Sequence, residues 1–108
     1  MTEKLTIKTK SYIARKLFKI TGQAVKKDFI YLYSLTKRNV SIEEMLNYYN
    51  DEYHNLESNI LTLLKALQYF DDADGSEMPE MIEKVDWEKI KKFFEKETVR
   101  IAKKYLEP

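Results

Sequence analysis

The chain has 108 residues, a length typical of one domain, with 44% hydrophobic, 34% charged and 13% aromatic residues and a net charge of +1. The aromatic content excludes a disordered chain, and the absence of cysteine excludes disulfide scaffolds, thiolate zinc sites, iron–sulfur clusters and cysteine nucleophiles. No apolar run approaches the roughly 18 residues of a membrane span, and the lysine-rich start lacks a signal core, so we expect a cytoplasmic protein with no membrane contact.

The few glycines and prolines leave long segments in which apolar residues recur at helical spacing. Helices are predicted over roughly residues 9–21, 25–37, 42–53, 56–70 and 87–106. No segment alternates as a strand does, so the predicted fold is all-α, a single bundle of about five helices forming one domain over residues 1–108. The residues expected to be buried are Ile13, Leu17, Ile20, Phe29, Leu32, Tyr33, Ile42, Met45, Leu46, Tyr49, Tyr53, Leu56, Ile60, Leu63, Leu64, Leu67, Phe70, Trp87, Ile90, Phe94, Ile101 and Tyr105.

The helix ends carry recognisable capping residues. Gly22 stands at the expected C-cap of the first helix, and Asn39 closes the second. Ser41 and Glu44 form a capping box for the third helix, and Asp86 is the expected N-cap of the last. The fourth segment is the most apolar, so we expect it at the centre of the bundle.

Residues 71–80 are the one predicted long loop, in which Pro79 opens a short helical turn. Its acidic residues resemble part of a calcium-binding loop. Placing Gly75 at the glycine position of such a loop puts Phe70 and Met81 at two essential ligand positions, so we expect no calcium site.

No catalytic or metal-binding arrangement is evident. His54 is the single histidine, and without cysteine it cannot complete an ordinary zinc site. Two glycines cannot form a glycine-rich phosphate loop. We therefore predict no catalytic residue, no metal ligand and no cofactor.

The net charge hides an uneven distribution. Residues 1–38 hold ten Lys or Arg against two acids, residues 39–86 hold two against twelve, and residues 87–108 hold seven against four. This asymmetry indicates a surface that contacts a polyanion weakly and without sequence preference, or basic and acidic segments that pack together or face water. The candidate contacts are Lys8, Lys10, Arg15, Lys19 and Lys26, and the spacing of Lys8, Arg15 and Lys19 places them on one helix face.

Five short segments carry a family resemblance. They are residues 16–20 (KLFKI), 26–33 (KKDFIYLY), 69–74 (YFDDAD), 78–81 (MPEM) and 87–94 (WEKIKKFF). Together they resemble the C-terminal helical half of the AbiEii/AbiGii-type nucleotidyltransferases, the toxins of abortive-infection and related toxin–antitoxin systems. The resemblance covers roughly residues 11–97.

The resemblance implies a remnant of a nucleotide-binding site at Lys16, Lys27 and Asp28. In that family an N-terminal α/β domain supplies acids that hold magnesium for nucleotidyl transfer, and the 108 residues contain no such domain. Gln23 stands at a position that the family fills with Arg, and Tyr31 at one that it fills with Asp. A neutral amide does not pair bidentately with phosphate, and a phenol does not replace a carboxylate near neutral pH.

These departures predict a non-catalytic helical module that acts through protein or nucleic-acid contacts and is not an enzyme on its own. The implied protein partner is a nucleotidyltransferase domain or an antitoxin. The alternative that the resemblance leaves open is a helical subunit or fragment of a nucleotidyltransferase whose catalytic domain is on another chain.

Overall fold

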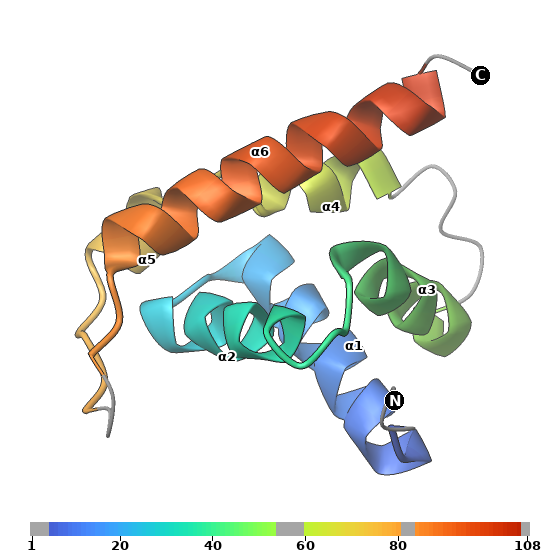
Figure 1. Ribbon diagram of the computed structural model, residues 1–108, viewed down its shortest axis with the longest axis horizontal. Helices are drawn as coiled ribbons and strands as arrows, with labels where there is room; N and C mark the ends of the chain where they lie inside the picture. Colours follow the sequence, from blue (N-terminus) through green and yellow to red (C-terminus); the bar gives the residue numbers. More distant parts are fainter. Residues whose placement is uncertain (1–4, 54–59, 81–83, 107–108) are drawn as a thin grey trace.

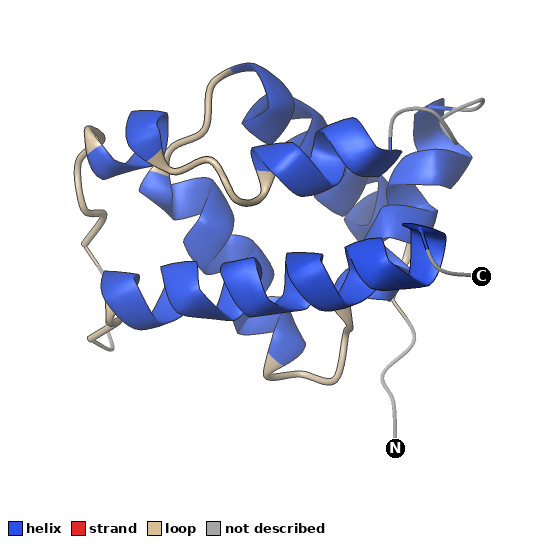
Figure 2. Cartoon of the chain, turned by 90° about the horizontal axis from the view of Figure 1, so that it is seen from above, coloured by secondary structure: helices blue, strands red, loops and turns tan. Residues whose placement is uncertain are grey.

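The computed structural model describes residues 5–53, 60–80 and 84–106, which contain helices and no strand (Figures 1 and 2). The helices are α1 (Ile7–Gly22), α2 (Lys26–Thr36), α3 (Ile42–Tyr53), α4 (Ile60–Ala66), the single turn α5 (Asp71–Asp74) and α6 (Trp87–Leu106). The prediction of an all-α bundle is confirmed. The expected helical residues 56–59 and the turn after Pro79 at residues 81–82 lie outside the described residues.

The helices form two layers. The long helix α6 lies beside α4 and α5 in one layer, and α1, α2 and α3 form the other (Figure 1). Helix α1 packs against α2, α3 and α4, and α2 and α4 both pack against α6. Among the described residues, α1 therefore contacts three other helices and α4 contacts two, so α1 is the central helix and the prediction that the most apolar segment is central is wrong.

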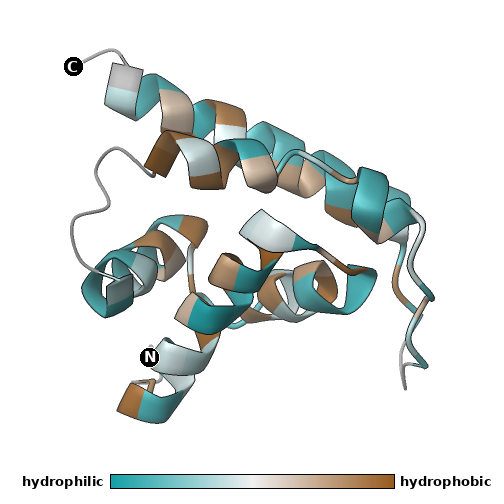
Figure 3. Cartoon of the chain, turned by 180° about the vertical axis from the view of Figure 1, so that it is seen from behind, coloured by the Kyte–Doolittle hydropathy of each residue, from teal (hydrophilic) through white to brown (hydrophobic). Residues whose placement is uncertain are grey.

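An aromatic cluster joins the two layers at one end of the bundle. The ring of Phe29 in α2 is fully buried and lies 5.3, 5.8 and 5.2 Å from the ring centroids of Phe70, Trp87 and Phe94. Tilted and edge-on aromatic pairs at these separations stabilise a core beyond the area that they bury. The remaining apolar residues are distributed along each helix (brown in Figure 3), so each helix contributes one face to this core.

Most of the capping predictions are confirmed. The amide of Glu44 donates to Ser41 Oγ at 3.1 Å while Glu44 Oε1 accepts from the Ser41 amide at 3.2 Å, which completes the capping box. Asp86 Oδ1 accepts from the amide of Lys89 at 3.2 Å at the start of α6. Helix α2 ends earlier than expected, at Thr36 with Lys37 as its C-cap, and Asn39 lies in the following turn in the left-handed conformation at φ 68°, which an asparagine tolerates better than most residues.

Other helix ends differ from the prediction. Helix α1 starts at Ile7 because Thr6 Oγ1 caps it, and Gly22 is its last helical residue while Gln23 is the C-cap. Helix α4 ends at Ala66 because, after a last bond from the Leu67 amide to the Leu63 carbonyl, the amides of Gln68 and Tyr69 turn back to carbonyls three residues earlier. The start of the predicted loop forms the helical turn α5.

Burial also departs from the prediction at a few positions. Tyr105, in the last turn of α6, is 56% exposed and not buried as expected. Thr98, which was not expected in the core, is fully buried. Its hydroxyl donates to the Phe94 carbonyl at 2.7 Å within α6. Asp28 is fully buried although it carries a charge. The predicted burial of Ile60, Leu63, Leu64 and Leu67 is confirmed.

Candidate polyanion-binding surface

Helix α1 carries basic residues and no acidic residue over its 16 positions. Lys8, Arg15 and Lys19 are all exposed and lie on one stripe of α1, opposite the residues that α1 buries. We call these three residues the basic face. Arg15 Nη2 donates to Ser11 Oγ on the same helix at 3.1 Å. Because serine is neutral, this hydrogen bond does not compensate the charge of the guanidinium.

A buried ion pair lies beside this face, where α1 and α2 meet. Lys16 Nζ donates to Asp28 Oδ1 at 2.9 Å, and the side chains are 12% and 0% exposed. Asp28 Oδ2 accepts no hydrogen bond from the described residues, but the ammonium of Lys19 lies 3.4 Å from it. Burial lowers the pKa of Lys16, and the hydrogen bond and charge of Asp28 outweigh that effect, so the pKa of Lys16 is raised overall.

Asp28 is buried for two local reasons. It lies in the first turn of α2, where a negative charge interacts favourably with the helix dipole, and it faces two lysines of α1. The expected nucleotide-site residues Lys16 and Asp28 are thus brought together, but their charges neutralise each other. Lys27 is exposed and forms no ion pair with either of them.

Two tyrosines lie over this ion pair. The rings of Tyr12 and Tyr31 pack edge to face with centroids 5.1 Å apart, and Lys16 Nζ lies 5.3 and 5.9 Å from them. Tyr12 is 47% exposed on the same side of α1 as the basic face. Burial, followed by the charge of Tyr12 when ionised, raises the pKa of Tyr31, so its hydroxyl stays protonated at neutral pH.

The remaining candidate contacts lie elsewhere. Lys10 Nζ is 5.4 Å from the ring of Tyr48 and lines a cavity shared with Asp51 and Glu52 of α3. Lys26 Nζ donates to the carbonyl oxygens of Asp74 and Ser76 at 3.0 and 2.5 Å, so Lys26 anchors the segment after α5 to the start of α2. Neither residue belongs to the basic face.

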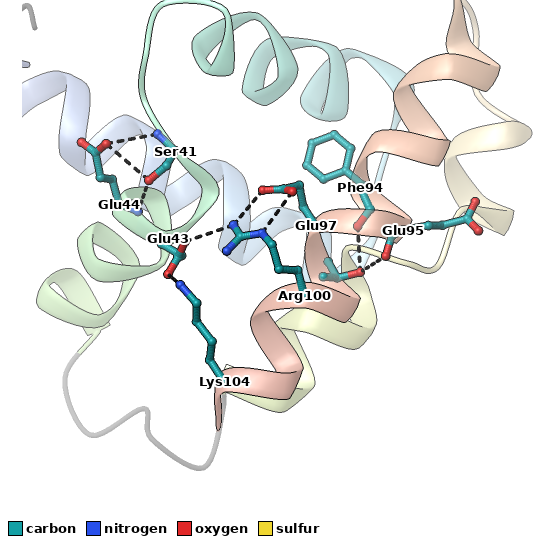
Figure 4. A network of polar contacts seen from close by, with 9 residues as sticks. Ser41, Glu43, Glu44, Phe94, Glu95, Glu97, Arg100 and Lys104 are labelled. Atoms are coloured by element: carbon teal, nitrogen blue, oxygen red, sulfur yellow. Dashed lines mark hydrogen bonds and ion pairs between the residues drawn. The ribbon is translucent and has the colours of Figure 1, made fainter. Parts of the chain in front are cut away.

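The acidic middle of the chain pairs with α6 and not with the basic face, within the described residues. Glu43 of α3 accepts from Arg100 Nη2 at 3.0 Å and from Lys104 Nζ at 2.9 Å (Figure 4). The hydrogen bonds from Lys104 and Arg100 hold the pKa of Glu43 below its usual value.

Asp74 behaves in the same way at the other end of α6. Its Oδ1 accepts from Trp87 Nε1 at 2.7 Å and from Lys91 Nζ at 2.9 Å. These two hydrogen bonds, that of Trp87 first, lower the pKa of Asp74. Asp74 therefore docks α5 onto α6, which gives the acidic loop a structural use.

A cavity of about 500 Å³ opens next to the two tyrosines. Its polar lining includes Tyr31, Ser34 and Arg38 from α2 and its C-terminus and Thr9 from α1. No ion pair involving Arg38 occurs among residues 5–53, 60–80 and 84–106. Sequence reasoning missed this cavity and the pairing of Tyr12 with Tyr31, because both depend on how α1 crosses α2.

The described part of the chain offers no group of three or more His, Cys, Asp or Glu side chains that could hold a metal ion. His54 lies outside that part. None of the described helices is long and apolar enough to cross a membrane.

Comparisons of this chain with protein-family models, with curated proteins and with solved structures find no match.

Proposed function

We propose that this chain is a non-catalytic helical module that binds a polyanion through the basic face of α1. The observation that carries the proposal is the combination of exposed Lys8, Arg15 and Lys19 with the absence of any acid on α1. Lysine and arginine side chains bind phosphates by charge, and an array without base-reading groups binds without sequence preference.

The pairing of the acidic residues supports the same proposal. If the acidic side chains of residues 39–86 covered the basic face, they would neutralise the charges of its three residues. Instead Glu43 and Asp74 pair with Arg100, Lys104 and Lys91 of α6. Lys8 and Arg15 form no ion pair with the described residues and remain available to an external partner, whereas Lys19 also lies 3.4 Å from Asp28.

The ion pair beside the basic face favours a binding role over a catalytic one. A lysine that holds a transferred phosphoryl group must bring its charge to the phosphate. Lys16 is 12% exposed and its charge is compensated by Asp28. We propose that this pair fixes α2 on α1 and so positions the basic face. On that basis we expect the purified chain to transfer no nucleotide from any nucleoside triphosphate in the presence of magnesium or manganese. Transfer of a labelled nucleotide that is lost in the Asp28→Ala variant would contradict this expectation.

Binding is tested by fluorescence anisotropy of the whole chain with a labelled single-stranded RNA and a labelled duplex DNA at low salt. Three phosphate contacts predict that the logarithm of the binding constant falls with the logarithm of salt with a slope of about −2 on single strands and about −3 on duplex DNA. The triple variant Lys8→Ala/Arg15→Ala/Lys19→Ala should lose most of the binding. No binding to either probe at tens of micromolar protein would refute the proposal.

A matched control separates the basic face from net charge. Lys92, Lys96 and Lys103 are exposed on α6 and repeat the same two spacings in reverse order. The variant Lys92→Ala/Lys96→Ala/Lys103→Ala removes the same charge from the other layer and should keep most of the affinity. Equal losses in the two triple variants would show that the site is not on α1.

A further inference from the structure

The cavity beside Tyr31 adjoins the basic face. Tyr31 lines the cavity, and its ring packs against that of Tyr12, which shares the exposed side of α1 with Lys8 and Arg15. A phosphate chain that follows the basic face therefore passes the mouth of a hollow in the protein. Charge alone gives no preference for a single strand over a duplex, but a hollow at this place does, because only an unpaired base is free to enter it.

The cavity has the size and the lining that a base requires. Its volume of about 500 Å³ lies within the range of roughly 300–1,000 Å³ usual for small-molecule pockets. Leu35 and Val40 supply apolar surface, and the ring of Tyr31 supplies an aromatic one. Single-stranded nucleic acids bind proteins by combining backbone charge with bases placed on such surfaces.

The polar groups of the lining match the edge of a base. Arg38 is a planar donor that forms no ion pair with the described residues. The hydroxyls of Thr9 and Ser34 already have local partners, Thr6 Oγ1 at 2.9 Å and the Tyr31 carbonyl at 2.6 Å. Each hydroxyl oxygen can still accept a hydrogen bond from a base. Donor and acceptor groups thus line one cavity together with an aromatic ring.

We propose that the ligand of the basic face is a single-stranded nucleic acid and that one of its unpaired bases enters the cavity between α1 and α2. This inference depends on the proposed function. A duplex binds more weakly, because a base must first leave its stack before it can enter. The phosphates on both sides of that base lie along the basic face.

The first experiment compares probes on the unmodified chain. Anisotropy is measured with a labelled single-stranded oligonucleotide, with an abasic strand of equal length and phosphate count, and with a duplex of that length. The base-bearing strand should bind about tenfold more tightly than the abasic strand, since stacking of one base accounts for a difference of this size. Equal affinities for the three probes would overturn the inference and leave the proposed function standing. Absence of binding to all three would overturn both.

The second experiment places the base in the cavity. Ser34→Leu narrows the cavity and replaces a polar group of its lining with an apolar one, and it should abolish the preference for the base-bearing strand while leaving abasic binding unchanged. Thr62→Leu, the same kind of exchange at an exposed position of α4, should leave both unchanged. If the Ser34→Leu chain keeps the tenfold preference, the base does not enter this cavity and the inference is wrong.

A pair of exposed substitutions covers the case in which Ser34→Leu fails to fold. Arg38→Gln removes a donor that lines the cavity, and Lys37→Gln removes the same charge from the neighbouring residue, which does not line it. Both should weaken abasic binding equally, and only Arg38→Gln should reduce the ratio of base-bearing to abasic affinity. Equal ratios in the two variants would count against a base in the cavity.

Discussion

Replacement of Asp28 by asparagine tests how much the buried ion pair between α1 and α2 stabilises the fold. The exchange keeps the size of the side chain and removes its charge. In the native chain the fully buried carboxylate accepts from Lys16 Nζ at 2.9 Å and has Lys19 Nζ at 3.4 Å. The variant loses a charge-assisted hydrogen bond and the negative charge in the first turn of α2.

The two losses set the expected magnitude. A hydrogen bond to a charged group contributes about 1.5–3 kcal/mol, and an acid at a helix N-terminus about 0.3–1 kcal/mol. Asp28→Asn should therefore lower the free energy of unfolding by about 2–4 kcal/mol. Lys16→Met should cost about 3–5 kcal/mol, because it leaves the buried carboxylate facing only Lys19, which is 55% exposed.

The measurement is urea unfolding followed by circular dichroism and by the fluorescence of Trp87, which is 8% exposed. The double variant Lys16→Met/Asp28→Asn completes the cycle, and it should be more stable than Lys16→Met alone, because it leaves no unpaired buried charge. If Asp28→Asn and Lys16→Met each change the free energy of unfolding by less than about 0.5 kcal/mol, the pair behaves as an exposed surface pair and the argument from its burial is refuted.

Two further predictions concern the core and the pH dependence of stability. Leu64→Ala should lower the free energy of unfolding by about 2–5 kcal/mol through lost burial and a cavity, whereas Leu61→Ala, at a position that is 40% exposed, should cost less than about 1 kcal/mol. Equal costs in urea unfolding would contradict the orientation of α4. The pKa of Glu43 is lowered in the folded state, so its ionised form stabilises the fold above the ordinary carboxyl pKa of about 4.3, and this contribution is lost as the pH falls through the lowered pKa. Glu43→Gln should therefore destabilise by about 0.2–1 kcal/mol at neutral pH and by less near pH 2, and a pH-independent effect would exclude the ion pairs with Arg100 and Lys104 as its cause.

The helices themselves could be predicted because their signals are local. Apolar residues at helical spacing identified the faces of α1, α3 and α6, and the capping box of Ser41 with Glu44 marked where α3 begins. A capping hydrogen bond joins residues three positions apart, so the sequence contains both partners. The exposure of Lys8, Arg15 and Lys19 on one stripe of α1 follows from the same periodicity.

The central position of α1 and the composition of the candidate site depended on contacts between distant residues. A charged side chain is rarely buried without a partner, and only the crossing of α1 and α2 brings Lys16 and Lys19 to Asp28 so that it can be buried. The same crossing places Tyr31 between Tyr12 and a cavity.

The sequence by itself determined the all-α class, the helix faces and the unequal charge of the three segments. It left open whether the acidic segment covers the basic one, because periodicity gives the direction of a side chain about its own helix and not the identity of the neighbouring helix. The tertiary structure places two of these acids, Glu43 and Asp74, against α6, and it places Asp51 and Glu52 beside Lys10 of α1. Ion pairs form between groups that the packing of the apolar core brings within a few ångströms, so the core, and not the charge pattern, determined which surface of α1 remains positive.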